Sequence, residues 1–226
     1  MFRGSATVAA LLIGCCGPAA AQLTANPAIM SFNGTENTRQ DIKIGNTSSR
    51  TQYLKISAAR ILEPGVNPET YFESPNPDEV GLLVAPRRIA LQPGEERIVR
   101  VILLEDEIET DKAWRVHIQP TIGDIEADRN VAVTLLAFKA LVFARPDNPT
   151  TEIVGGRDGK TLTLTNVGTS NVVLFNGEQC PGNDEPCQRV TGKRLWPGLE
   201  WVTELPADAP VTFELRDTGE DRSIEF

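Results

Sequence analysis

Histidine is almost absent from this chain of 226 residues, which contains a single one, His117. A Ser-His-Asp triad could therefore only use His117, and no Gly-x-Ser-x-Gly segment supplies a matching nucleophile. Zinc signatures, phosphate-binding loops and dinucleotide fingerprints are also missing from the sequence. An exported enzyme is therefore the weakest of the function classes, and we expect no catalytic residue, no cofactor and no metal site.

Basic residues are outnumbered, since 22 Lys and Arg stand against 31 Asp and Glu and leave a net charge of -9. This acidity argues against binding of nucleic acid phosphates as the main task. Basic amphipathic helices, which suit a protein of the membrane surface, are not visible. Hydrophobic residues make up 40% of the chain and charged residues 23%, which is enough for ordinary globular cores.

The chain also lacks an apolar segment long enough to span a bilayer. The apolar run near the N-terminus is too short for this. It follows a basic start with Arg3 and ends in the small residues Ala19 to Ala21, which predicts a signal peptide over residues 1–21. Residues 12–15 also resemble a lipoprotein cleavage box that would lipidate Cys15. Either route exports the protein, and we expect no integral membrane segment once the signal is removed.

Cysteine is scarce, and the exported chain keeps only Cys180 and Cys187, in the segment CPGNDEPC. In an exported protein, a lone pair separated by Pro, Gly and Asn predicts a local disulfide. A zinc site would need more ligands than this pair supplies.

Short runs of alternating apolar and polar residues recur along the chain, which predicts an all-β fold. Clear examples are residues 52–61, 96–104 and 114–120, and turn pairs such as Pro93-Gly94 separate them. A proline-rich segment without apolar residues, PDNPTTE, follows Arg145 and suits a linker. We therefore expect two β-sandwich domains, an N-terminal one over residues 22–146 and a smaller C-terminal one, with the disulfide, over residues 147–226.

The most apolar part of the chain is VAVTLLAFKALVFARP, residues 131–146, in which only Thr134 and Lys139 interrupt the apolar run before Arg145. It has the form of the last strand of the first sandwich. A central strand buried on both faces would explain it. An edge strand waiting for a partner is the alternative, because exposed apolar edges otherwise aggregate.

Several segments together resemble the periplasmic pilus-assembly chaperones of the PapD-like family, in a divergent, non-enterobacterial form. They are GLLVAPRRIALQPGEERIVRV, AWRVHIQP and the strand that ends in LVFARP, and NGEQCPGNDEPCQRVTGKRLWPGLEW resembles a disulfide-bearing second domain of the family. The resemblance covers nearly all of the chain after residue 21.

This resemblance implies two immunoglobulin-like sandwiches in a boomerang, located in the periplasm. It also implies partners, namely pilin-like subunits and an outer-membrane usher. Family members complete an unfinished pilin sandwich with their own last strand of domain one, a known case of strand addition. The alternating side chains expected to enter the subunit are one of the two rows, and we favour the row Thr134, Leu136, Phe138, Ala140 and Val142 over the row of Leu135 and Leu141.

The family also implies an arginine on the first strand and a lysine on the last, which bind the subunit's C-terminal carboxylate. Here Ile29 and Met30 stand where the arginine is expected, and Leu141 stands at the lysine position. Lys139 lies two residues earlier and therefore on the same side of the strand. The candidate anchor residues are Arg115, Lys139, Arg100 and Arg88, since a paired arginine and lysine can bind a carboxylate by charge-assisted hydrogen bonds.

A secreted two-sandwich adhesin or structural module is the main alternative function. The sequence names neither the subunit nor the fibre.

Overall fold

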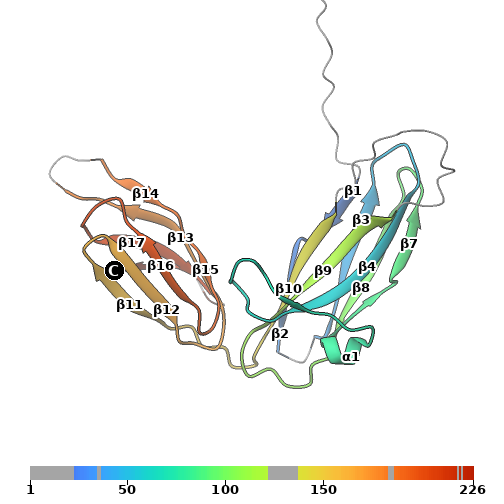
Figure 1. Ribbon diagram of the computed structural model, residues 1–226, viewed down its shortest axis with the longest axis horizontal. Helices are drawn as coiled ribbons and strands as arrows, with labels where there is room; N and C mark the ends of the chain where they lie inside the picture. Colours follow the sequence, from blue (N-terminus) through green and yellow to red (C-terminus); the bar gives the residue numbers. More distant parts are fainter. Residues whose placement is uncertain (1–22, 35–36, 122–136, 183–185, 218, 220) are drawn as a thin grey trace, which may run out of the picture.

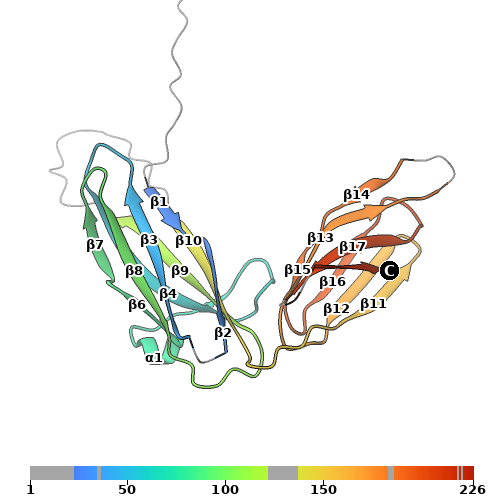
Figure 2. The same cartoon turned by 180° about the vertical axis from the view of Figure 1, so that it is seen from behind.

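The computed structural model describes residues 23–34, 37–121, 137–182, 186–217, 219 and 221–226. The sequence prediction of an all-β fold is confirmed, because the only helix in these ranges is the short α1 (Pro77–Val80). Two groups of strands form the two arms of a V (Figures 1 and 2). None of the described helices has the length and apolar character that crossing a membrane requires. The predicted signal peptide lies outside the described residues.

The first arm is a sandwich of two sheets. One sheet has the order β1-β3-β8-β6, and the other has the order β2-β10-β9-β4-β5, with β7 also paired to β4. The strands of the first sheet are β1 (Leu23–Asn26), β3 (Arg39–Asn46), β8 (Glu96–Leu103) and β6 (Leu82–Ala85). Those of the second are β2 (Ile29–Asn33), β10 (Phe138–Arg145), β9 (Lys112–Thr121), β4 (Gln52–Ile61), β5 (Tyr71–Phe72) and β7 (Arg88–Leu91).

The second arm is also a sandwich, with sheet orders β11-β12-β16 and β14-β13-β17-β18, and with β15 paired to β13. Its first sheet contains β11 (Ile153–Asp158), β12 (Thr161–Asn166) and β16 (Glu200–Glu204). Its second contains β14 (Gln188–Val190), β13 (Val172–Gln179), β17 (Val211–Arg216), β18 (Arg222–Glu225) and β15 (Arg194–Leu195). Residues 146–152 connect the arms, where the sequence predicts the domain boundary.

Each arm has its own hydrophobic core, as the alternating strands require. The first surrounds Trp114, which is fully buried and whose indole Nε1 donates a hydrogen bond to the carbonyl of Val80 at 2.7 Å. The second surrounds Phe213, which packs edge-on against Trp201. A third, smaller cluster joins the arms at the elbow, where Phe143 of the first packs against Trp196 of the second with ring centroids 5.8 Å apart.

One segment that the sequence predicts as a continuous run, GLLVAPRRIAL, is divided between the two sheets. Strand β6 pairs with β8, whereas β7 pairs with β4 on the other side of the sandwich. Pro86 lies at the crossing, where its missing backbone N–H costs no ladder hydrogen bond. The crossing places Arg88 and Arg100 on different sheets.

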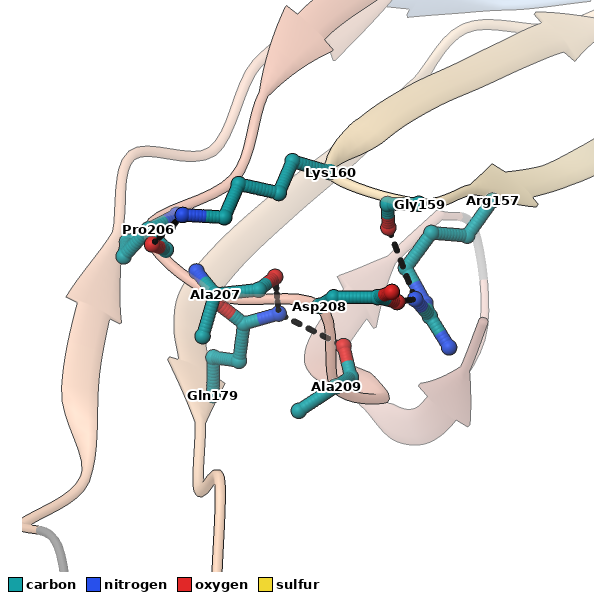
Figure 3. A network of polar contacts seen from close by, with 8 residues as sticks. All are labelled: Arg157, Gly159, Lys160, Gln179, Pro206, Ala207, Asp208 and Ala209. Atoms are coloured by element: carbon teal, nitrogen blue, oxygen red, sulfur yellow. Dashed lines mark hydrogen bonds and ion pairs between the residues drawn. The ribbon is translucent and has the colours of Figure 1, made fainter.

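In the second arm, a buried amide holds the loop between β16 and β17 (Figure 3). Gln179 is fully buried, and its Nε2 donates to the carbonyls of Ala207 and Ala209 at 2.8 and 2.5 Å. Its Oε1 accepts a hydrogen bond from the backbone N–H of Ala207 at 2.9 Å. Lys160 donates to the carbonyl of Pro206 at 3.1 Å from the neighbouring hairpin. The end of β13 is therefore fixed next to Cys180.

Cys180 and Cys187 form the expected disulfide. It lies beside the pairing of Gln179 with Gln188 and so closes the β13–β14 hairpin. Glu178 is close to both sulfur atoms, but the disulfide leaves no thiolate for a metal at this group.

Replacing both Cys180 and Cys187 by serine should destabilise the second arm by about 2 kcal/mol, because the bond closes only a short loop. The first arm has a separate core and should keep its stability. Urea unfolding followed by backbone NMR signals of β9 and β13 would compare the two arms. Equal destabilisation of both arms, or free thiols in the oxidised native protein, would contradict this prediction.

Candidate functional site

Strand β10 presents two rows of side chains with different surroundings. Ala140, Val142 and Ala144 are buried in the core of the first arm. Lys139 and Leu141 point out of the opposite face, where Lys139 is exposed and Leu141 half-buried. The next residue of this outer row, Phe143, enters the elbow cluster. The strand therefore joins the core of the first arm to the elbow cluster.

The sequence prediction favours the row of Phe138, Ala140 and Val142 for entry into a subunit, which requires it to be exposed in the free protein, but Ala140 and Val142 are buried. Val142 lies opposite Trp114 in the register with β9, so its side chain belongs to the core. Phe138 is half-buried and packs against the same core. Thr134 and Leu136 lie outside the described residues. The sequence signal for this orientation is Lys139. A lysine is almost never buried, so the row that contains it must face outwards.

One backbone edge of β10 is unpaired at its beginning. Strand β2 runs parallel to β10 only from the pair Leu141 and Ile29 onwards, and the N–H of Leu141 donates to the carbonyl of Ala28 at 2.9 Å. The strand that precedes β2 in the chain, β1, belongs to the other sheet, where it pairs with β3. Within the described part of the chain, residues 138–140 thus pair only with β9. An unpaired edge of this kind can accept a strand from another protein.

The structure brings Arg115 and Lys139 together on the outer face beside this edge. Arg115 lies opposite Leu141, and Lys139 lies opposite His117, so the two cations are diagonal neighbours on adjacent strands. Ile29 flanks Leu141 on its other side and is 53% exposed. Leu141 therefore lies between an exposed apolar side chain on β2 and a cation on β9.

A carboxylate of the same chain already binds Arg115. Glu69, from the loop between β4 and β5, accepts hydrogen bonds from Nε and Nη2 of Arg115 at 3.0 and 2.5 Å. The hydroxyl of Tyr71 donates to the same carboxylate at 2.5 Å. The ammonium group of Lys139 lies 5.5 Å from the centroid of the Tyr71 ring. We name Glu69, Tyr71, Arg115, His117 and Lys139 the cleft cluster.

The electrostatics of the cleft cluster favour an ionised carboxylate. The hydrogen bonds from Arg115 lower the pKa of Glu69, and the nearby charge of Lys139 acts in the same direction. Burial lowers the pKa of His117, and the charge of Lys139 lowers it further, so the imidazole is neutral near pH 7. His117 is only 9% exposed, and its Nε2 has no hydrogen-bond partner among the described residues.

The other two candidate anchors lie elsewhere. Arg100 belongs to the opposite sheet, where it pairs with Asp41 at 3.2 Å. Arg88 is exposed on β7 and lies opposite Lys55, with β4 between it and β9. The structure therefore groups Arg115 with Lys139 and with neither of these arginines. Whether Arg115 and Lys139 bind a carboxylate of another chain stays a prediction.

Sequence reasoning did not find Glu69, Tyr71 or Asp111. Asp111 lies at the elbow, where its Oδ2 accepts hydrogen bonds from the backbone N–H of Asn171 at 2.7 Å and the hydroxyl of Ser170 at 3.2 Å. Burial raises the pKa of Asp111, although these hydrogen bonds oppose the shift. The segment around Glu69, VNPET, has the composition of an ordinary turn, so nothing in it marks a functional residue.

The chain is similar to proteins of fimbriae. No family model matches the chain. A CS1 fimbrial subunit of Escherichia coli is 26% identical over 174 residues, which cover 72% of this chain and 72% of that protein. The class 5 fimbriae chaperone CfaA is 18% identical and superposes with a TM-score of 0.70 over 90% of this chain and 97% of its own.

Chains from two solved complexes superpose on this chain to a similar extent. A chain of a chaperone–tip adhesin complex of CFA/I fimbriae has 19% identity and a TM-score of 0.68 over 91% of this chain and 98% of that one. A chain of the CsuC–CsuE chaperone–tip adhesion subunit complex of Acinetobacter baumannii has 10% identity and a TM-score of 0.62 over the same shares. The chain thus has the two-domain fold of the PapD-like fimbrial chaperones, as its sequence predicts.

The orientation of β10 can be tested with one substitution at two neighbouring positions. Val142→Asp should lower the free energy of unfolding by more than about 4 kcal/mol, because it buries an unpaired carboxylate. Leu141→Asp should lower it by only about 1 kcal/mol, because that side chain is half-exposed and faces Arg115. Thermal and urea unfolding of both variants provide the measurement. Similar losses at both positions would contradict the orientation.

The contact between Glu69 and Arg115 should depend on pH. Because the folded protein lowers the pKa of Glu69 below its ordinary value of 4.5, its contribution to stability is present above that pH and is lost as the pH falls through the folded value. The difference in unfolding free energy between wild type and Glu69→Gln should be at most about 1 kcal/mol near pH 7. It should shrink below pH 4.5 and vanish in an Arg115→Ala background. A difference that grows on acidification would contradict this prediction.

Proposed function

We propose that this protein is a periplasmic chaperone that binds pilin-like subunits by adding β10 and the residues before it to the subunit's sheet. It then delivers them to an outer-membrane usher for assembly of a surface fibre. One observation carries the proposal, namely that residues 138–140 of β10 pair only with β9 in the described part of the chain, while Lys139 on their outer face is a diagonal neighbour of Arg115. The likeness to fimbrial chaperones, two of them in complexes with adhesins or adhesion subunits, supports it.

Strand addition needs a backbone edge and a row of apolar side chains. In the free protein, residues 138–140 offer the edge, and the half-buried Leu141 of the outer row lies outside the core of the first arm, at the margin of the elbow cluster. Main-chain hydrogen bonds would supply the pairing, and alternate side chains would fill the pockets of an incomplete pilin sandwich. The row that enters the subunit is therefore that of Leu141. Leu135, which has the same parity, lies outside the described residues.

The cations give the added strand a fixed register. In the proposed complex, Arg115 and Lys139 hold the subunit's C-terminal carboxylate by charge-assisted hydrogen bonds. A carboxylate held at one end of the pairing stops the subunit's strand from sliding along β10, because a shift by one residue would present the wrong face. The anchor thus decides which side chains meet the groove.

A secreted structural module of the fibre is the second candidate, and the relative named as a fimbrial subunit favours it. The two candidates predict different locations. A chaperone stays in the periplasm in a complex with its subunit and is absent from the finished fibre. A structural module is recovered from purified fibres.

Replacing Arg115 or Lys139 by alanine should weaken binding of a co-expressed pilin-like subunit at least tenfold, since each removes a hydrogen bond to a charged group worth about 1.5–3 kcal/mol. The midpoint of thermal unfolding should change little. Arg100→Ala is the matched control, because it removes a cation from the opposite sheet. Pull-down and calorimetry on purified complexes provide the measurement. Wild-type affinity in both variants would place the anchor elsewhere.

A further inference from the structure

The contact between Glu69 and Arg115 has the geometry of a bound ligand. Two N–H groups of one guanidinium edge, Nε and Nη2, bind the two oxygens of one carboxylate. An incoming carboxylate would use the same paired geometry, which suits the planar guanidinium best. Glu69 therefore occupies the strongest carboxylate-binding position of Arg115.

The loop that carries Glu69 does not need this contact to form. The β4–β5 hairpin is closed by the pairing of Ile61 with Tyr71 and by a hydrogen bond from the N–H of Leu62 to the carbonyl of Thr70 at 3.0 Å. The loop projects towards the second arm (Figure 1), where Gly65 packs against Trp196 and Leu199. Most residues from Leu62 to Pro68 are exposed. Glu69 can thus leave Arg115 while both ends of the loop stay in place.

The charges of the cleft cluster also leave a place for one more anion. Arg115 is paired with Glu69, and Glu73 is a second acidic group near enough to act on the pKa of His117. Among the residues that the structure describes, Lys139 forms no ion pair. A pocket of about 450 Å³ opens next to it, lined by Glu69, Tyr71 and residues 65–68. The pocket beside Lys139 has room for a carboxylate.

Glu69 and a second carboxylate would repel each other in this small space. The charge of Lys139 already acts on Glu69, so an anion bound at Lys139 would be close to the glutamate as well. Like charges at such distances disfavour each other. The repulsion is removed if Glu69 moves away and the second carboxylate binds Arg115 in its place.

We propose that Glu69 is an internal substitute for the partner's C-terminal carboxylate, which occupies Arg115 in the free protein and is displaced on binding. The proposal rests on the proposed function, because it takes the cleft cluster as the anchor for that carboxylate. Glu69 keeps Arg115 neutralised and oriented while no pilin-like partner is present. It also sets the affinity of the anchor, because every bound carboxylate must first displace it.

The probe is N-acetylglycine, which carries a free carboxylate next to a peptide group as the end of a chain does. Binding to the full-length exported protein is measured by NMR titration, following the side-chain signals of Arg115 and the amide signals of β9 and β10. Glu69→Gln should bind N-acetylglycine at least about threefold more tightly than wild type, because the competing charge is gone. Arg115→Ala should not bind it, and N-acetylglycinamide should bind to none of the proteins.

Asp41→Asn is the matched control. It also removes one negative charge that is paired with an arginine, but at Arg100 on the opposite sheet. Its affinity for N-acetylglycine should equal that of wild type. A threefold gain in this variant as well would show that net charge, and not the position of Glu69, explains the result.

Other outcomes separate the inference from the proposed function. Equal or weaker binding in Glu69→Gln overturns the inference, and weaker binding would mean that Glu69 holds Arg115 in place for the ligand. If neither protein binds N-acetylglycine up to its solubility limit, the cleft cluster is not a carboxylate site and the inference also fails. If Glu69→Gln gains affinity but wild type captures no pilin-like subunit, the internal substitute stands and the chaperone proposal falls.

Discussion

The register between β9 and β10 determines the rest of the first arm. Trp114 is the largest fully buried side chain, and it lies opposite Val142. Side chains alternate along a strand, so this pairing commits one row of β10 to the core and sends the other row into the cleft. The same alternation on β9 places Arg115 and His117 on the cleft face. The position of one tryptophan thus decides where every cation of the cleft cluster points.

The outer row of β10 also ties the cleft to the elbow. Two residues beyond Leu141, Phe143 packs against Trp196 of the second arm, and the guanidinium groups of Arg145 and Arg194 lie 5.2 and 5.5 Å from its ring centroid. Trp196 in turn contacts Gly65 in the loop that carries Glu69. A substitution at Gly65 would therefore push on both arms, because an added Cβ would lie within 2.8 Å of Trp196. The outer face of β10 and the elbow thus share one set of side chains.

Much of the fold could be predicted from the sequence, because alternation, turn pairs and the cysteine spacing are local patterns. The orientation of β10 was harder, since both of its rows are rich in apolar residues and only Lys139 distinguishes them. Arg100 and Arg115 occupy equally ordinary strands, and only the order of strands in the two sheets separates them. The role of Glu69 could not be predicted from the sequence. Its contact with Arg115 joins residues 46 positions apart, and the loop that carries it has no regular pattern.

Ile29 and Arg115 flank Leu141 from the two neighbouring strands of β10. Ile29 lies on the β2 side of β10, where the unpaired edge begins, whereas Arg115 lies on the side where β10 is already paired. In the proposed complex, the added strand pairs with β10 in the plane of the sheet and the carboxylate binds above the outer face, so the two do not compete for the same space. Glu69 of the β4–β5 loop binds the cation on the β9 side of β10, whereas Ile29 lies on the other side. In this chain, Arg115 is thus the cation that a carboxylate of the β4–β5 loop can bind.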